Sequence, residues 1–460
     1  MELVNRRNKI VTRITISLCA LLGIYLLTSI YFMNHLYLGS KINGTDVSGK
    51  TVEEIKSQMA SELNTYALNI KERGDKKEQI KSGDINLKYK SDEQFKKFKY
   101  EQNPLKWISS IFNTKNSNMT AEISYDKERL AKQIDNLSCF TDSNIIQPKE
   151  PSFKYVGNAF VVVDQIKGNK VDKNILLKHV TDAISRMDST IDLESSNCYV
   201  TPKYTAKSEK VIKARDMLNK YVSSKITYTF GNDKEILDGS AINKWVTVDS
   251  NFNVSLDKRK VKEYIVSLAN TYNTSGKTRS FNTSSGNTIS ISGGDYGWQI
   301  NIDKEVQDLS ESIKKGQTIV KEPSYNQTAV SHTGNDIGNT YVEIDMTQQH
   351  LWFYKNGSLI VDGDVVTGNV SLNTATPEGI YRLEDKQRNT TLKGQDYNSP
   401  VSFWMPFNGG IGIHDASWRN VFGGDIYKTN GSHGCVNSPY SLAQAVFDNI
   451  HIGTPVVCYY

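Results

Sequence analysis

The chain has 460 residues, which is too long for one ordinary hydrophobic core and predicts two to four domains. The formal net charge is +5, but residues 1–13 alone contribute +3, so the remainder is close to neutral and no basic stripe indicates nucleic-acid binding. Five cysteines without a CxxC or Cys/His spacing exclude a disulfide-rich scaffold and a zinc site, and we expect no bound metal.

An apolar, uncharged run covers residues 14–32, directly after the basic tail at residues 1–13. About 20 apolar residues cross a bilayer as a helix, and basic residues mark the cytoplasmic side. We therefore expect a cytoplasmic tail, a single transmembrane anchor at 14–32 in the cytoplasmic membrane, and all later residues outside the cell membrane. A cleaved signal peptide is the alternative, but its apolar core is usually ~7–15 residues long and no small-residue cleavage site follows here.

Residues 33–121 are predicted to form an extracellular α+β region. Thr51 and Glu54 have the spacing of a capping box, which predicts that a helix begins at Val52. The mixed charges of residues 71–78 indicate the solvated tip of a hairpin.

The middle of the chain contains signs of a duplication. Two pairs of aspartates begin helical patterns at the same offset of 131 residues: Asp126 with Asp257, and Asp172 with Asp303. Equal offsets at separated positions indicate a repeated α+β unit, which we place at 122–205 and 252–324, with a connecting segment at 206–251. Chance similarity between short helices is the alternative.

Several cysteine and aromatic side chains are expected to be structural. Cys139 and Cys198 can pair in an oxidising exterior or remain two buried thiols, and the sequence leaves both possibilities open. Cys458 lies in an alternating apolar run and is predicted to be a core residue. Tyr296 and Trp298 are predicted to fill a small core rather than bind glycan.

Residues 325–339 are polar, aperiodic and glycine-bearing, which predicts a linker. Over 340–460 the pattern changes to short alternating strands, and Asn356-Gly357 between two of them is a strong hairpin signal. One helix is expected at 441–449. The predicted fold class is therefore a mainly β C-terminal domain, preceded by duplicated α+β domains and one N-terminal transmembrane helix.

The C-terminal region contains a cysteine with two nearby histidines. Cys435 lies in the segment 432–437 next to one histidine, and His414 lies 21 residues upstream. Cysteine reacts as a thiolate, and a histidine within hydrogen-bond reach is the usual base. Gly434 permits an unusual backbone dihedral beside a developing oxyanion, and Asn437 can hold the turn through its side chain. This pattern predicts an active site.

These residues resemble the signature of the L,D-transpeptidase catalytic domain over about residues 338–460. The matching stretches are His414, 376–381, 412–414, 432–437 and 453–456. The repeated region before them is similar to the peptidoglycan-binding domains that often precede this module in Gram-positive bacteria. The resemblance implies an L,D-transpeptidase catalytic domain at 340–460.

The resemblance also implies a role for each matching residue. Cys435 would be the nucleophile, His414 the general base, and the backbone carbonyl of Asp415 would orient the imidazole, so the side chain at 415 should matter little. His433 is the fourth candidate catalytic residue, although it can serve only to support the loop. The amides of Gly434 and Cys435 would bind the oxyanion. Further residues are expected to support that loop or to contact substrate: Ser432, Gly434 and Asn437 for the loop, and Trp418, Tyr397 and Trp404 for the substrate.

The chemistry implied by the resemblance needs no cofactor. The thiolate would attack the third residue of a tetrapeptide donor stem, expel the terminal D-alanine and form a thioester. The acceptor amine of a neighbouring peptidoglycan stem would then attack, which cross-links two third residues. Acylation by carbapenems at the same cysteine is expected.

Two other functions stay open at this stage. The same acyl-enzyme can pass to water or to another amine, which would give an L,D-carboxypeptidase or a wall-attachment acyltransferase. A vestigial catalytic module would instead give a non-catalytic cell-wall-binding scaffold, and the intact His414 and Cys435 pair argues against this. Only the products separate the first alternative from a transpeptidase, because acceptor choice depends on the shape of the groove.

Overall fold

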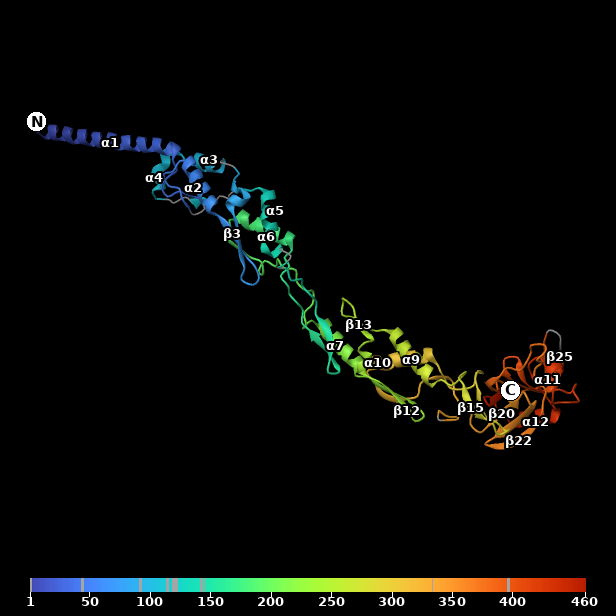
Figure 1. The fold of residues 1–460 in the computed structure, drawn as a ribbon. Helices are drawn as coiled ribbons and strands as arrows, with labels where there is room; N and C mark the ends of the chain where they lie inside the picture. The colour runs from blue at the N-terminus through green and yellow to red at the C-terminus, as the bar shows by residue number, and fades with distance from the viewer. Residues whose placement is uncertain are drawn as a thin grey trace. The chain divides into compact units, whose positions relative to one another are not determined.

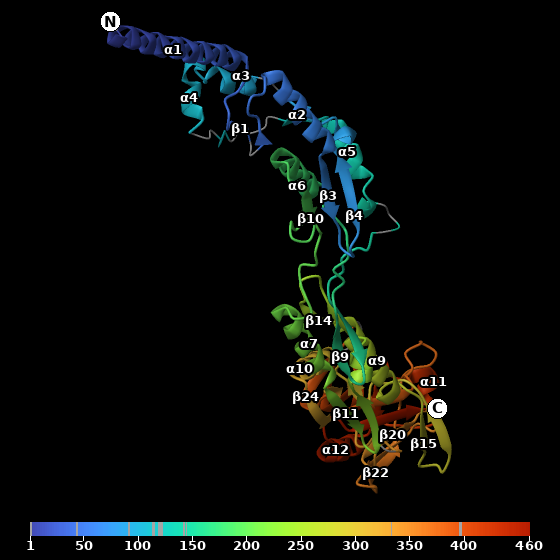
Figure 2. The ribbon, with the colours of Figure 1, turned by 90° about the vertical axis from the view of Figure 1, so that its left-hand side faces the viewer.

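The computed structural model divides the chain into two compact units (Figures 1 and 2). It describes all residues except 1, 43–44, 91–92, 113–115, 118–122, 141–142, 144, 333 and 395–397. Unit 1 consists of Met1–Ser152 and Asp164–Ala206, and unit 2 consists of Phe153–Val163 and Lys207–Tyr460. The hairpin at 153–163 therefore belongs to unit 2, although unit 1 flanks it in sequence.

The chain begins with helix α1 (Glu2–Asn34), the dark blue helix of Figure 1. Its segment Leu3–Asn34 is long and apolar enough to cross a membrane. Most of its apolar side chains are exposed, which is costly in water and favourable in lipid. The predicted apolar helix is confirmed, and both a membrane anchor and a signal sequence have this form.

Unit 1 has a three-stranded sheet in the order β10-β3-β4, in which β3 and β4 form an antiparallel hairpin and β10 runs parallel to β3. Its longer elements are α2 (Val52–Thr65), β3 (Ala67–Lys71), β4 (Lys77–Lys81), α3 (Glu93–Tyr100), α5 (Lys127–Asp135), α6 (Lys173–Arg186) and β10 (Thr190–Asp192). Shorter elements are β1 (Lys41–Ile42), β2 (Thr45–Asp46), β5 (Lys88–Tyr89), α4 (Trp107–Ser110), β6 (Asn116–Ser117) and β7 (Ile123–Ser124). The predicted capping box is confirmed, because Thr51 and Glu54 each accept a hydrogen bond from the backbone of the other.

The first part of unit 2 repeats this topology. Its sheet has the order β12-β11-β18, again with an antiparallel hairpin and a third strand parallel to the first of the hairpin. The elements are β8 (Ser152–Val156), β9 (Ala159–Val163), α7 (Glu209–Val222), β11 (Lys225–Phe230), β12 (Asp233–Leu237), α8 (Gly239–Ile242), β13 (Val246–Val248), β14 (Val254–Leu256), α9 (Lys258–Tyr272), α10 (Ile302–Lys315) and β18 (Thr318–Lys321). The predicted duplication of an α+β fold is confirmed.

All four segments that the repeat predicted to open a helix do so, and in three of them the aspartate is the N-cap. Asp126, Asp172 and Asp257 are the N-caps of α5, α6 and α9, where each carboxylate accepts backbone N–H groups. The fourth segment, 302–304, also opens a helix as predicted, but its aspartate is not the N-cap. Asn301 caps α10 by accepting the Lys304 N–H at 3.0 Å, so Asp303 lies inside the first turn.

Two packed sheets form the C-terminal part of unit 2. Their orders are β22-β21-β20-β28-β23 and β24-β25-β26-β27, and buried apolar side chains from both sheets and from helix α12 form one core. The elements are β20 (Tyr341–Asp345), β21 (His350–Lys355), β22 (Ser358–Asp364), β23 (Gly379–Arg382), β24 (Gln387–Lys393), β25 (Asn398–Asn408), β26 (Ile411–Asp415), α11 (Ile426–Asn430), β27 (Val436–Ser438), α12 (Tyr440–Asn449) and β28 (Pro455–Tyr459). The predicted helix near 441–449 and the hairpin at Asn356-Gly357 are confirmed; both turn residues have positive φ, at 53° and 80°.

Four further short strands of unit 2 form two-stranded sheets of their own. They are β15 (Arg279–Asn282) with β16 (Thr288–Ile291), and β17 (Gln299–Ile300) with β19 (Tyr325–Gln327). Within 325–339, the carboxylate of Asp336 pairs with Arg279 at 2.7 Å, and Ile337 is buried. Tyr296 and Trp298 are buried core residues, as predicted.

The cysteines away from the C-terminal site are free thiols. Cys139, Cys198 and Cys458 are all buried, so the question left open by the sequence is resolved in favour of two unpaired thiols and a core cysteine. Burial raises the pKa of Cys139 to about 12 and that of Cys198 to about 11. Both groups therefore stay protonated as thiols at neutral pH.

Candidate active site

Strand pairing brings His414 and Cys435 together. Strand β26 runs parallel to β27, and His414 lies opposite Asn437 in their register. Neighbouring strands are about 4.8 Å apart, so Cys435, which directly precedes β27, lies beside the strand that carries His414. Gly412 makes the close packing on the other side possible, because a Cβ there would lie 2.6 Å from the Met405 carbonyl oxygen on β25.

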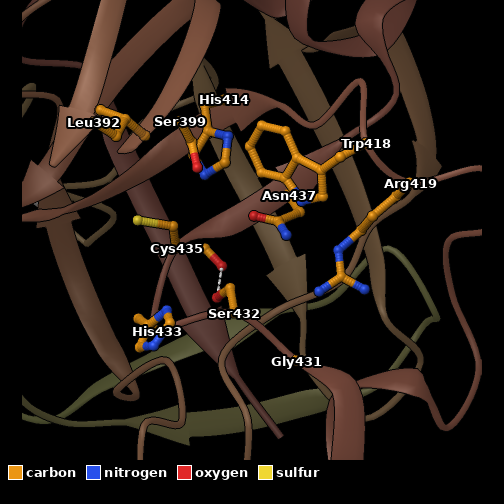
Figure 3. A pocket seen from close by; sticks show the side chains of 10 residues that line it. All are labelled: Leu392, Ser399, His414, Trp418, Arg419, Gly431, Ser432, His433, Cys435 and Asn437. Carbon is orange, nitrogen blue, oxygen red and sulfur yellow. Dashed lines mark hydrogen bonds between the residues drawn. The ribbon is translucent and has the colours of Figure 1, made fainter. Parts of the chain in front are cut away.

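Both residues open into one pocket (Figure 3). The pocket is lined by the following residues: Leu392, Ser399, His414, Trp418, Arg419, Gly431, Ser432, His433, Cys435 and Asn437. The structure thus brings together six of the residues that the sequence predicted for the site: His414, Trp418, Ser432, His433, Cys435 and Asn437.

His414 is held as a neutral base. Its Nδ1 lies 2.9 Å from the backbone oxygen of Asp415, and because a carbonyl only accepts, Nδ1 carries the proton and Nε2 keeps a lone pair. The side chain is buried, and this burial lowers the pKa of the imidazole. The rings of Trp404 and Trp418 lie 5.9 and 5.8 Å from it, centroid to centroid. An uncharged imidazole with a free Nε2 can accept a proton at neutral pH.

Cys435 rests as a thiol. Its side chain is buried, and burial raises the pKa of the thiol, while the backbone of Gly412 lowers it by a smaller amount. The Sγ atom donates a weak hydrogen bond to the Gly410 oxygen at 3.6 Å, and Figure 3 shows the sulfur turned away from the imidazole of His414. A rotation about the Cα–Cβ bond is therefore needed before the base can take the proton, as is common in enzymes without bound substrate.

Asp415 has a second task that the sequence analysis did not foresee. Its Oδ1 atom accepts the backbone N–H groups of Ser402 and Phe403, at 2.8 and 2.9 Å. These bonds tie β25 to the end of β26, where the Asp415 carbonyl orients His414. The expectation that the side chain at 415 matters little therefore lacks support, since the carboxylate itself fixes the strand end.

The loop before Cys435 is fixed from within. Gly434 has φ = +117°, a conformation that favours glycine, so the predicted unusual dihedral is confirmed. The Ser432 hydroxyl accepts the Gly434 N–H at 3.1 Å and donates to the Cys435 oxygen at 2.5 Å, the bond drawn in Figure 3. The Gly434 amide must leave Ser432 before it can serve an oxyanion.

Two threonines that sequence reasoning missed hold the same loop from outside. Thr376 Oγ1 donates to the Gly434 oxygen at 2.7 Å and accepts the Gly368 N–H at 3.0 Å. Thr374 Oγ1 donates to the Ser432 oxygen at 2.9 Å. The segment 376–381 was noted only as a matching stretch, and nothing local to Thr376 reveals a contact 58 residues away.

The residues expected to contact substrate have different positions. Trp418 lines the pocket and is half exposed. Trp404 is buried and packs against Val401 and Cys435. It is not among the residues that line the pocket, so it supports Cys435 through packing. Tyr397 lies outside the described residues. Leu392, Ser399, Arg419 and Gly431 line the pocket without having been predicted.

The described residues contain no cluster of three or more His, Cys, Asp or Glu side chains arranged to hold a metal ion. The pocket offers instead a nucleophile, a base and backbone amides. This arrangement is suited to acyl transfer through a covalent intermediate.

Comparison with known proteins gives two kinds of match. The family model "L,D-transpeptidase catalytic domain" matches residues 339–458. The family model "Putative peptidoglycan binding domain" matches twice, at residues 78–192 and 204–321. A search of curated proteins finds no match.

Solved structures include several similar chains. A cysteine-to-serine variant of an Enterococcus faecium L,D-transpeptidase is 34% identical, over 53% of this chain and 98% of its own, with a TM-score of 0.44. The Ldtfm-avibactam carbamoyl enzyme is 33% identical, over 54% of this chain and 99% of its own, with a TM-score of 0.45. The E. faecium L,D-transpeptidase catalytic domain acylated by ertapenem is 42% identical, over 26% and 98%, with a TM-score of 0.25.

The resemblance seen in the sequence is therefore confirmed by the family models and by sequence identity across nearly the whole length of a relative. The repeated domains that match the peptidoglycan-binding model indicate the cell wall as the place where the catalytic domain works. This chain belongs to the L,D-transpeptidase family and is a cell-wall transpeptidase.

Proposed function

We propose that this transpeptidase is anchored in the cytoplasmic membrane and joins the third residues of two peptidoglycan stems through a thioester on Cys435. One observation carries the proposal. His414 lies on β26, and Cys435 directly precedes the parallel neighbouring strand β27; both open into one pocket, with the imidazole oriented by the Asp415 carbonyl so that Nε2 is available as the base.

The first half-reaction acylates the enzyme. After rotation of the side chain, His414 Nε2 takes the Cys435 proton while the sulfur forms a bond to the carbonyl carbon of the third stem residue. Backbone amides near Cys435 stabilise the oxyanion. The carbon–nitrogen bond to D-alanine then breaks, the leaving amine takes the proton from His414, and a thioester remains.

The second half-reaction transfers the acyl group. The acceptor amine of a second stem enters the position that D-alanine has left and attacks the thioester, giving its proton to His414. The carbon–sulfur bond breaks and the sulfur regains a proton. The half-exposed Trp418 beside the imidazole covers one side of the pocket and limits the access of water. We assign loop support to His433, which lines the pocket next to the nucleophile.

The N-terminal helix and the repeats position this chemistry at the wall. We propose that α1 is an uncleaved anchor with its N-terminal side in the cytoplasm, because the basic residues precede the apolar run. The two repeats would then lie outside, between the membrane and the catalytic domain in the order of the chain. The proposed organisation keeps a catalytic domain at 340–460 and the peptidoglycan as its partner, with a tetrapeptide donor and an acceptor amine.

Intact-protein mass spectrometry tests the acyl-enzyme. Incubated with a carbapenem, the protein should gain the mass of one adduct, and His414→Gln should slow this by roughly 10²–10⁴-fold, the usual contribution of a general base. His451→Gln is the matched control, because His451 is exposed and is not among the residues that line the pocket. Adduct formation at the normal rate in His414→Gln would contradict the assigned base.

A further inference from the structure

Arg419 places a cation in the active-site pocket. It lies in the loop after β26, five residues beyond His414, and its backbone N–H donates to the Ala416 oxygen at 3.0 Å. Figure 3 shows its guanidinium directed toward Gly431, across the pocket from the Cys435 sulfur. Its Nε atom is buried and has no hydrogen-bond partner within the described part of the chain.

Among the described residues that line the pocket, none carries a negative charge that would neutralise this cation. The described lining residues include two histidines and Arg419 but no aspartate or glutamate. Asp415, the acidic residue four positions before Arg419 in the sequence, uses its Oδ1 atom to accept the Ser402 and Phe403 backbone N–H groups. Burial lowers the pKa of Arg419, the sign of a charge that has lost water without gaining an anion. A buried donor without a partner is costly, so this site is energetically prepared for an acceptor.

The chemistry of guanidinium identifies the acceptor. Its planar fork of N–H groups matches the two oxygens of a carboxylate, and charge-assisted bonds of this kind are the strongest hydrogen bonds in proteins. In a tetrapeptide stem, the carbonyl carbon attacked by sulfur and the carboxylate carbon of the terminal D-alanine are separated by only three bonds. The carboxylate must therefore lie within about 4 Å of the reacting carbon, in the same pocket.

We propose that Arg419 binds the free carboxylate of the D-alanine that leaves the donor stem, and thereby selects stems that end one residue after the scissile bond. This assignment rests on the proposed function, because it concerns the donor in that reaction. A stem with an added residue, or with its terminal carboxylate converted to an amide, presents no anion at this position. Arg419 is thus a substrate-binding residue that determines donor specificity.

Release of the terminal residue from two matched donors tests the inference. One donor is the soluble disaccharide tetrapeptide and the other is its C-terminal carboxamide, with kcat/KM measured for the full chain in detergent. We expect wild type to prefer the carboxylate by tenfold or more. Arg419→Gln should lose at least tenfold on the carboxylate donor, mainly through KM, and less than twofold on the carboxamide, and Arg419→Lys should lose less than Arg419→Gln.

Two controls separate binding from damage. Lys428→Gln removes an exposed cation of α11 that pairs with Asp425, and it should leave the preference unchanged. Alkylation of Cys435 by iodoacetamide, which is neutral, should proceed at the same rate in Arg419→Gln as in wild type.

Three results would overturn the inference: equal losses on both donors in Arg419→Gln, a wild type without preference, or a preference that follows another carboxylate of the stem when that group is amidated instead. Because the readout is release of the terminal residue, it does not depend on the acceptor. Release without cross-links would overturn the proposed transpeptidation and leave the assignment of Arg419 standing.

Discussion

At the scale of single residues, the nucleophile and its base are both uncharged before substrate binds. Burial raises the pKa of the Cys435 thiol and lowers the pKa of the His414 imidazole, so the pair does not rest as a thiolate and an imidazolium. The Sγ atom contacts the Gly410 oxygen rather than the imidazole. Activation therefore belongs to the substrate complex.

The pH dependence follows from these two directions. Because the pKa of His414 is lowered, its basic form persists below the usual value of about 6.5, and carbapenem acylation should lose rate only at more acidic pH. Because the pKa of Cys435 is raised, alkylation by iodoacetamide in the absence of substrate should keep rising with pH through and above the usual thiol range. Stopped-flow acylation and mass-monitored alkylation measure the two profiles. A flat alkylation rate from pH 5 upward would show a resting ion pair.

The Asp415 carboxylate gives a second prediction at this scale. Asp415→Ala leaves the Ser402 and Phe403 amides without their acceptor, at roughly 1–3 kcal/mol for each buried group, and loosens the strand end that orients His414. Urea denaturation and the acylation rate should both report the loss. Asp415→Asn retains an acceptor oxygen and should lose less, and Asp425→Ala, an exposed control, should lose nothing measurable. Wild-type stability in Asp415→Ala would contradict this role.

Sequence reasoning found the residues of the site that act through their own chemistry or through local backbone rules. Cys435, His414 and the positive φ of Gly434 are of this kind. It missed the Asp415 carboxylate because the partners lie on a strand whose pairing no local pattern reveals. It missed Arg419 because a single arginine in a loop is usually a solvated surface residue.

At the scale of elements, the catalytic loop at 432–435 is held by the strand β27 that follows it and by the turn that contains Thr374 and Thr376. The parallel pairing of β26 with β27 fixes its end, and Ser432 closes it internally. Thr376 and Thr374 hold its backbone carbonyls from the neighbouring turn. These bonds hold the loop in one conformation before substrate arrives, but the Gly434 N–H is bonded to Ser432 and must be released before it can stabilise an oxyanion.

Removing one of these supports should slow the chemistry more than it unfolds the protein. Thr376→Val keeps the shape but loses the bonds to Gly434 and Gly368, which costs roughly 1–3 kcal/mol of stability and lets the loop shift. We expect a lower kcat with little change in KM, measured on the disaccharide tetrapeptide. Thr391→Val, on the exposed part of β24, is the control. An unchanged kcat in Thr376→Val would show that the loop does not need this support.

Local rules predicted those elements that carry their own signal. The capping box at Thr51, the Asn356-Gly357 hairpin and helix α12 are confirmed for that reason. The predicted opening of a helix at 302–304 is also confirmed, although Asn301, and not the aspartate that marks the repeat, caps α10.

At the scale of the whole molecule, two related α+β folds precede one catalytic domain in the chain. Each has an antiparallel hairpin joined by a parallel third strand, and the family models recognise both copies. The β15–β16 hairpin packs Phe281 and Ile291 against Ile380 and Val457 of the catalytic sheets. In unit 2 the catalytic domain therefore shares apolar contacts with the segment that precedes it. The equal offsets in sequence revealed the repeat, but not this packing, which depends on tertiary contacts.

Removal of unit 1 tests what the repeats do. A variant that begins at residue 207 keeps nearly all of unit 2, including the β15–β16 hairpin and the complete pocket. Compared with a chain that begins at residue 33, we expect it to lose several-fold more activity on intact cell walls than on soluble stems, since fewer binding sites reduce the local concentration of enzyme at the polymer. Product release from sacculi and from soluble stems gives the ratio. Equal losses on both would argue that the first repeat has no targeting role.

The central claim is that Cys435 carries the acyl group from one stem to another. Mass spectrometry of products from the protein that begins at residue 33, incubated with a disaccharide tetrapeptide, tests it most directly. We predict a dimer lighter than two substrates by one alanine, with no such product in Cys435→Ala. A tripeptide alone would show transfer to water instead, and a dimer formed by Cys435→Ala would contradict the role of this cysteine.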